Sequence, residues 1–292
     1  ELFQRKLRPY WRKKHSDIGS LLREAFARHE EIERACAAYD EELMADLRAS
    51  GGEAFARLSA LSFRQCTAAQ KLCVDYNGAP LHFPKENYSG GFIATVDVHY
   101  PAAPFPLLFN PELLKAELTP VFDYVRSGNW PYPFAPHDLG NYPKANGQTY
   151  GGADLPMHMQ MPVEECGNML LMVAGLAKIE RSAEYAQAQW PILEQWAGYL
   201  LEKGLDPENQ LCTDDFMGHL AHNANLSIKA ILGIGSFGML CEMAGKREEA
   251  ARYTKQASAN GTLRIHNNRN AVGAAATALS TGSFTLDGLE IS

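Results

Sequence analysis

The sequence lacks the short motifs of several large enzyme classes. It contains no G-x-S-x-G nucleophile elbow, no phosphate-binding P-loop and no H-E-x-x-H zinc motif. Gly233 and Gly235 lie inside a helical pattern that no strand precedes, so they do not make a dinucleotide-binding fingerprint. The six cysteines form no C-x-x-C pair, which argues against a zinc knuckle or a thioredoxin-type site. We therefore look for chemistry in carboxylates, histidines and amides.

The composition also gives little indication of nucleic acid or a membrane as a partner. The chain has 27 Lys and Arg against 34 Asp and Glu, a net charge of −7, and its one basic cluster, at residues 5–14, is short. Nucleic-acid binding would need a larger group of clustered cations. No run approaches 18 apolar residues, so we expect no membrane-spanning helix. The first residues lead into charges without a signal-peptide pattern, and the chain does not begin with Met, so we expect a processed or truncated piece.

Helical periodicity dominates the 292 residues, which are long enough for a sizeable core. Caps, apolar spacing and Gly or Pro stops predict helices over two segments within 15–49, then 53–74, 111–126, 164–180, 183–203, 217–244 and 247–258. The stripe of the third helix is expected to be buried. Successive helical pairs with loops between them indicate a mainly α fold, an α/α solenoid or (α/α)6-type toroid.

Two regions depart from the helical pattern. Asn77-Gly78 predicts a β-hairpin, and Thr95-Val96-Asp97-Val98 alternates like a short strand, so we expect a small β insertion over about 74–98. Residues 129–160 form a long loop rich in proline and aromatic residues. Loops of that length in compact domains are usually functional or disordered, and the aromatics favour order.

The stretch around Glu164 and Glu165 is the first candidate site. Pro162 suits the first turn of a helix, and acids are favoured there because the helix end is partly positive. These glutamates therefore have a purely structural explanation. They are also placed to do acid–base work, and a helix N-terminus would lower the pKa of a glutamate and favour a base.

Other polar residues gather at further loop-to-helix junctions, which would converge at one end of a ring of helices. Asp214 and Asp215 precede a helix, where one is a plausible cap, and His137-Asp138 is equally explained as a loop pair. His219 and His222 are three residues apart and could hold a metal with the two aspartates, although packed histidines are commoner. We expect no metal and no other cofactor.

The candidate residues fall into two groups. Those for catalysis are carboxylates that could supply a general base and a general acid around a water: Glu164, Glu165, Asp214, Asp215 and Asp138. Those for substrate binding could hold charged ends or an oxyanion: Lys85, Glu86, Asn87, Asp97, His137, Asn168 and Asn225. Which carboxylate is the acid and which the base is left open.

Several of these strings together resemble the bacterial and fungal glutaminase A family. The strings are 85–87, 95–98, 133–140, 142–148, 161–169, 206–216 and 219–227, and the resemblance covers roughly residues 10–258. It implies an (α/α)6-type toroid, usually preceded by a β-sandwich-like region, and hydrolysis of the side-chain amide of L-glutamine. It also implies a secreted or periplasmic protein. No such upstream region is present in this sequence.

The C-terminal part differs from the pattern of that family. We divide the chain into a glutaminase-like toroid domain at residues 1–259 and an atypical tail at 260–292, with short strands or poor order. Either this tail substitutes for the last helices of the ring or the ring is incomplete. Two other functions are considered. One is a toroidal glycoside hydrolase with paired carboxylates, and the other a non-catalytic binding or structural fragment. The oligomeric state is left open.

Overall fold

The computed structural model describes residues 1–86, 90–152, 154–213, 219–267, 284–286 and 289–291. Its α-helices are α1 (Ile18–Ala27), α2 (His29–Ala68), α3 (Val96–Ala102), α4 (Pro104–Phe109), α5 (Pro111–Arg126), α6 (Pro162–Glu180), α7 (Glu184–Ala188), α8 (Trp190–Tyr199), α9 (Ala224–Met243) and α10 (Arg247–Asn267). Short helical turns are η1 (Tyr10–Lys13), η2 (Met157–Met159) and the π-helical η3 (Leu200–Gly204). The strands are β1 (Arg8–Pro9), β2 (Gln70–Val74), β3 (Pro80–Pro84), β4 (Phe284–Leu286) and β5 (Leu289–Ile291). The predicted mainly α fold class is confirmed.

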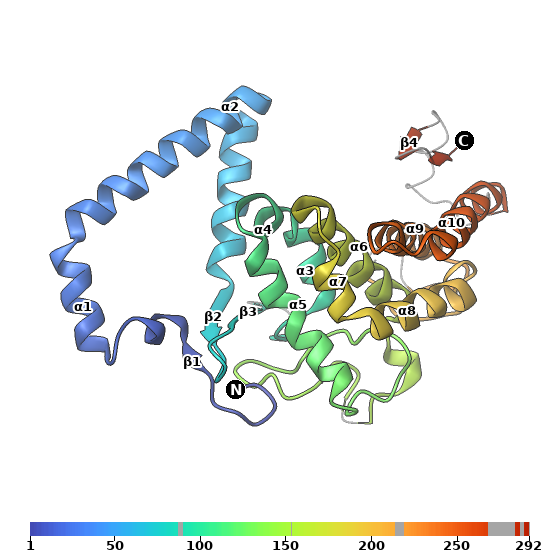
Figure 1. Ribbon diagram of the computed structural model, residues 1–292, viewed down its shortest axis with the longest axis horizontal. Coiled ribbons are helices and arrows are strands. Elements are labelled where there is room, and N and C mark those ends of the chain that lie inside the picture. Colours follow the sequence, from blue (N-terminus) through green and yellow to red (C-terminus); the bar gives the residue numbers. More distant parts are fainter. Residues whose placement is uncertain (87–89, 153, 214–218, 268–283, 287–288, 292) are drawn as a thin grey trace.

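The body of the molecule is a group of packed helices, α3 to α10, with the small sheet at its edge (Figure 1). α6 is central, because it packs against α3, α5, α8 and α9. Phe122 of α5 stacks on Trp196 of α8 with ring centroids 5.3 Å apart, and both side chains are fully buried. Phe134 and Phe237 extend the same core from the long loop and from α9.

The predicted hairpin is present, but one predicted strand is wrong. β2 and β3 pair antiparallel from Gln70↔Pro84 to Val74↔Pro80, and Gly78 takes a φ of +83° in the turn between them. The segment from Thr95 to Val98 instead begins helix α3. Four alternating residues cannot distinguish a strand from a helix start. Here Val96 and His99, three residues apart, both face the core.

Helices α1 and α2 form an arm at one side of the body (Figure 1). α2 continues through the predicted stop at residues 50–52, with a kink at Gly52, and ends at Ala68 because residues 70–74 pair as β2. The buried stripe predicted for 53–74 is wrong for Phe55, Leu58 and Leu61, which are 45–65% exposed. Periodicity identified these helices, but periodicity does not show whether a partner covers the apolar face.

The long loop between α5 and α6 is ordered around its aromatic residues. The Trp130 indole Nε1 donates to the Phe134 carbonyl at 2.5 Å, and the Tyr132 and Phe134 rings stack 4.9 Å apart. Its segment 137–140 is paired with 93–96: Ile93 N donates to Gly140 O, Leu139 N to Ile93 O, and Val96 N to His137 O. This pairing brings the start of α3 against the loop.

Helices α6 and α9 cross at very short distance. A Cβ added to Gly167 of α6 would lie 2.5 Å from Lys229 Cγ and 3.1 Å from the Lys229 backbone oxygen on α9. A Cβ added to Gly233 of α9 would lie 3.2 Å from Gly167 Cα. Only glycine permits this approach, and the approach places Lys229 beside the N-terminal turns of α6.

Helix α9 and the C-terminal segment concern two further expectations, the absence of a membrane-spanning helix and the start of a tail at residue 260. By length and composition alone, α9 could span a membrane; 56% of its apolar window is buried, and it packs between α6 and α10, as a core helix does. α10 continues beyond the predicted end at 258, and β4 and β5 pair antiparallel. The division of the chain at residue 259 stays a prediction.

We expect Gly167→Ala to destabilise the protein by about 1–3 kcal/mol, because the new methyl group overpacks the α6–α9 crossing. Gly198→Ala is the matched control, since Gly198 lies on helix α8 with nothing within 4 Å of an added Cβ. It should raise stability by up to about 1 kcal/mol through helix propensity. Urea unfolding of both variants measures the difference. Equal effects would contradict the crossing described above.

Candidate active site

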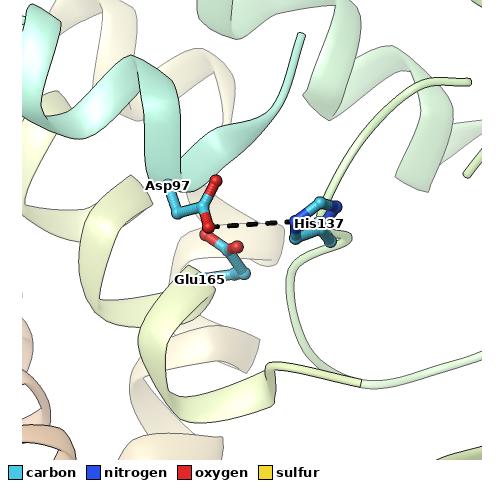
Figure 2. Close-up of side chains that lie close together, drawn as sticks. All are labelled: Asp97, His137 and Glu165. Carbon is cyan, nitrogen blue, oxygen red and sulfur yellow. Dashed lines mark ion pairs between the residues drawn. The ribbon is translucent and has the colours of Figure 1, made fainter. Parts of the chain in front are cut away.

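Asp97, His137 and Glu165 come together at the N-terminal end of α6 (Figure 2), and we call them the carboxylate–histidine cluster. Asp97 lies in the first turn of α3, His137 in the long loop, and Glu165 in the first turn of α6. One side-chain ligand atom from each lies within 4.8 Å of the others, and His137 Nε2 is 3.8 Å from Asp97 Oδ2. All three side chains are at most 8% exposed.

His137 is held in place by Asp138 and by aromatic rings. The fully buried Asp138 carboxylate accepts from the backbone N–H groups of Gly140 (2.7 Å), Thr149 (3.1 Å) and Tyr150 (3.2 Å), and it lies 2.9 Å from His137 Nδ1. The Tyr150 ring stacks on the imidazole at 4.2 Å. With Nδ1 turned to Asp138, Nε2 is the imidazole nitrogen that faces the cluster.

Burial disfavours the ionised form of both carboxylates of the cluster. Desolvation, then the negative charges of Asp97 and Glu164, raise the pKa of Glu165 well above its usual value. Desolvation likewise raises the pKa of Asp97 to about 6, although His137 opposes the shift. The expectation that the helix end would lower the pKa is wrong for Glu165, because removal from water outweighs the helix dipole there.

Lys229 of α9 lies close to the cluster. Its Nζ donates to Asn168 Oδ1 at 2.7 Å and lies 3.6 Å from the centroid of the Tyr100 ring. Asn168 in turn donates through Nδ2 to Glu165 Oε2 at 3.1 Å, so it links the lysine to the cluster. Burial lowers the pKa of Lys229, against the charges of Glu164, Glu165 and Asp97. Sequence reasoning missed this residue, although a lone cation within the apolar run 226–241 was a usable signal.

Glu164 turns toward a different segment from its neighbour. Its carboxylate accepts from the Thr213 backbone N–H at 2.9 Å and from the Thr213 hydroxyl. Gln210, in the same segment, accepts from Val163 N at 3.0 Å and so caps α6. The end of the 206–213 loop is therefore fixed at the site. Thr213 and Gln210 were not predicted.

The remaining predicted residues are divided between the edge of the site and elsewhere. Glu86 borders the cluster: it accepts from Thr95 Oγ1 at 3.1 Å, and its charge contributes to the raised pKa of Asp97. Lys85 instead lies over the Tyr142 ring, and Asn225 is exposed at the start of α9. Asn87, Asp214 and Asp215 lie outside the described residues.

The metal set considered at His219 and His222 does not assemble among the residues the structure describes. His219 Nδ1 accepts from the Cys212 backbone N–H at 3.3 Å, while His222 Nδ1 lies 2.8 Å from Asp206 Oδ1 in a pair exposed to solvent. Within the described residues, the carboxylate–histidine cluster is the group with metal-ligand geometry. A separate cavity of about 230 Å³, lined by Lys6, Arg8, Arg12, Lys13, Val74, Asp75, Tyr76 and Gly78, contains none of the site residues.

The cluster has the parts that hydrolysis requires. The pKa values of the two buried carboxylates, Asp97 and Glu165, are both raised, and by different amounts, so one is suited to accept a proton and the other to donate one. The imidazole of His137 is oriented by Asp138, and half-buried Lys229 is linked to Glu165 through Asn168. This arrangement suits attack by water on a small polar substrate more than electron transfer or nucleotide chemistry.

Comparison with known proteins agrees with the geometry. The family model of the glutaminase A six helical-hairpin domain matches residues 52–280, beginning at the kink in α2. The chain is 36% identical over 216 residues to glutaminase A of Aspergillus oryzae, covering 74% of this chain and 30% of that protein. It is 28% identical over 309 aligned positions to a probable glutaminase of Arthroderma benhamiae, covering 86% of this chain and 35% of that protein. The chain thus spans about a third of the length of these relatives.

Replacing Asp138 tests how the imidazole is held. Asp138→Asn places amide hydrogens against backbone donors in a fully buried position, and we expect a loss of about 3 kcal/mol in unfolding free energy. Asp206→Asn is the matched control, because Asp206 also pairs with a histidine at 2.8 Å but is 54% exposed. It should cost less than about 1 kcal/mol. Similar losses in the two variants, measured by chemical denaturation, would show that burial of Asp138 is unimportant.

Proposed function

The chain belongs to the glutaminase A family, and from this membership and its buried site we propose that it hydrolyses the side-chain amide of L-glutamine to L-glutamate and ammonia. The observation that carries the proposal is the carboxylate–histidine cluster with Lys229 linked to it through Asn168, inside the part of the chain that the family model matches. A buried acid–base pair beside a cation is what a small amino-acid amide requires. The reaction class of a hydrolase also agrees with the names of the relatives.

The cluster would hold the attacking water. Ligand atoms of Asp97, His137 and Glu165 lie within 4.8 Å of one another, so a water bound among them would have acceptors on more than one side. As its oxygen attacks the amide carbon, the proton passes to a carboxylate of the cluster, which returns it to the departing nitrogen as the C–N bond breaks. Glutamate and ammonia are the products, and the cluster regains its initial protonation.

In this proposal Lys229 and Asn168 recognise the α-carboxylate of the substrate. Lys229 is an ammonium with three donors, and the described contacts assign one donor to Asn168 and turn one face toward the Tyr100 ring. Glu86, at the edge of the cluster, is suited to the α-ammonium group. An amino-acid substrate thus has a protein partner for each of its two charges. A neutral sugar would leave these protein groups without a partner.

The first test is the identity of the reaction. Ammonia release from L-glutamine by the purified chain, with no release of reducing sugar from α- or β-linked oligosaccharides, is the expected result. Sugar release would favour the glycoside-hydrolase alternative. Absence of both activities in a folded protein would favour a binding or structural role.

The second test is the role of the cluster. Glu165→Gln and Asp97→Asn should each lower kcat/KM for glutamine by at least about 100-fold, because each removes a proton acceptor from the reaction. Glu117→Gln is the matched control: Glu117 is 1% exposed and pairs with His82 Nδ1 at 2.8 Å, but belongs to a different buried pair. Its kcat/KM should stay within about threefold of wild type. A Glu165→Gln enzyme with full activity would refute the site.

The third test is substrate recognition by Lys229. Wild type should prefer L-glutamine over 4-aminobutanamide, which has the same amide but no α-carboxylate. Lys229→Met keeps the length of the side chain and removes the charge, so this preference should fall by about 100-fold. The control is Lys178→Met, because Lys178 lies near the C-terminal end of α6. An unchanged preference in Lys229→Met would mean that the α-carboxylate is bound elsewhere.

A further inference from the structure

Two oxygen atoms of the carboxylate–histidine cluster have no hydrogen-bond donor among the described residues. They are Glu165 Oε1 and Asp97 Oδ1, both inaccessible to solvent. The Glu165 side chain is completely buried, and Figure 2 shows its carboxylate and that of Asp97 pointing toward each other. A buried acceptor without a donor is costly, so a cation at this position would remove a large penalty.

The charges around the cluster are strongly unbalanced. Asp138 lies 2.9 Å from His137 Nδ1, Glu86 accepts from Thr95 two residues before Asp97, and Glu164 adjoins Glu165 in the first turn of α6. The cation Lys229 reaches the cluster only through Asn168 in the described contacts. Asp97 and Glu165 thus stand among further carboxylates in a region with little access to water. Such a region attracts positive charge.

The donor types define the ion. Two carboxylates and one imidazole form a mixed oxygen and nitrogen set, which suits divalent transition ions such as Mn²⁺ or Zn²⁺. The ligand atoms lie within 4.8 Å of one another, near the separation of about 3–4 Å that bonds of about 2.1 Å produce. Asp138 on His137 Nδ1 and Asn168 on Glu165 Oε2 orient two of the three ligands from behind, as outer partners of metal ligands do.

We propose that Asp97, His137 and Glu165 bind one divalent transition-metal ion, and that this ion holds the water used in amide hydrolysis. The second half of this statement rests on the proposed function, while the first half does not. The proposal departs from the expectation that the protein needs no metal. It also places the ion away from His219 and His222, the histidines to which the sequence drew attention.

Mn²⁺ is the probe of choice, because it is paramagnetic and binds weakly to the free thiols that would capture Zn²⁺. The chain is treated with a chelator, dialysed and titrated with Mn²⁺ while the electron paramagnetic resonance signal of free Mn²⁺ is followed. We expect one site per chain and a rise in Tm on binding. Glu165→Gln and Asp97→Asn should each weaken that site at least about tenfold.

Glu117→Gln and Asp206→Asn are the controls, since each removes a carboxylate that pairs with a histidine outside the cluster. Both should bind Mn²⁺ like wild type. Absence of binding up to millimolar Mn²⁺, or equal binding by wild type and both cluster variants, would overturn the proposal. If Glu165→Gln does not fold, as judged by near-UV circular dichroism, Asp97→Asn and His137→Gln give the same comparison.

Ammonia release separates this inference from the proposed function. Hydrolysis of glutamine by the chelated protein, with no added ion, would refute the metal and leave the glutaminase activity standing. One Mn²⁺ bound at the cluster without any hydrolysis of glutamine would leave the metal site standing and refute the function. Recovery of activity in parallel with occupancy of the site would support both.

Discussion

The close crossing of α6 and α9 is the constraint on which the site depends. Gly167 and Gly233 have no side chains to separate the two helices, so the α9 backbone reaches the first turns of α6. Lys229 then stands beside Asn168 and close to Glu165. A larger residue at Gly167 would move Lys229 away from the buried carboxylates. Packing of small residues therefore determines the electrostatics of the site, although neither glycine takes part in any chemistry.

The site destabilises the folded state, because it buries polar groups without full partners, as functional sites commonly do. Glu165 and Asp97 are withheld from water beside other carboxylates, and each has an acceptor without a donor in the described structure. A purely structural core would place apolar side chains here. By contrast, Asp138 accepts from several backbone N–H groups. Asp138 thus stabilises the loop. Asp97 and Glu165 stay in an unfavourable environment, and a bound proton, substrate or cation would lower its cost.

The sequence predicted much of the secondary structure and part of the site. The hairpin at Asn77-Gly78, the helix from Pro111 and the helix start at Pro162 were correct, because turn residues and helix-start residues act over a few positions. Thr95 to Val98 was wrong because four residues carry too little periodicity. The buried stripe of 53–74 was wrong because an apolar face does not reveal its partner, and in this chain Phe55, Leu58 and Leu61 stay exposed on the arm.

The sequence by itself determined that carboxylates and histidines sit at loop-to-helix junctions, and its long ordered motifs indicated the family that the comparisons confirmed. It could not decide which junctions meet. The pairing of 93–96 with 137–140 brought Asp97 to His137, and the α6–α9 crossing added Lys229, a residue that local pattern did not single out. It also could not decide the sign of the pKa shift at Glu165. A helix end is a local feature and lowers that pKa, whereas burial raises it, and the degree of burial is set by elements distant in the chain.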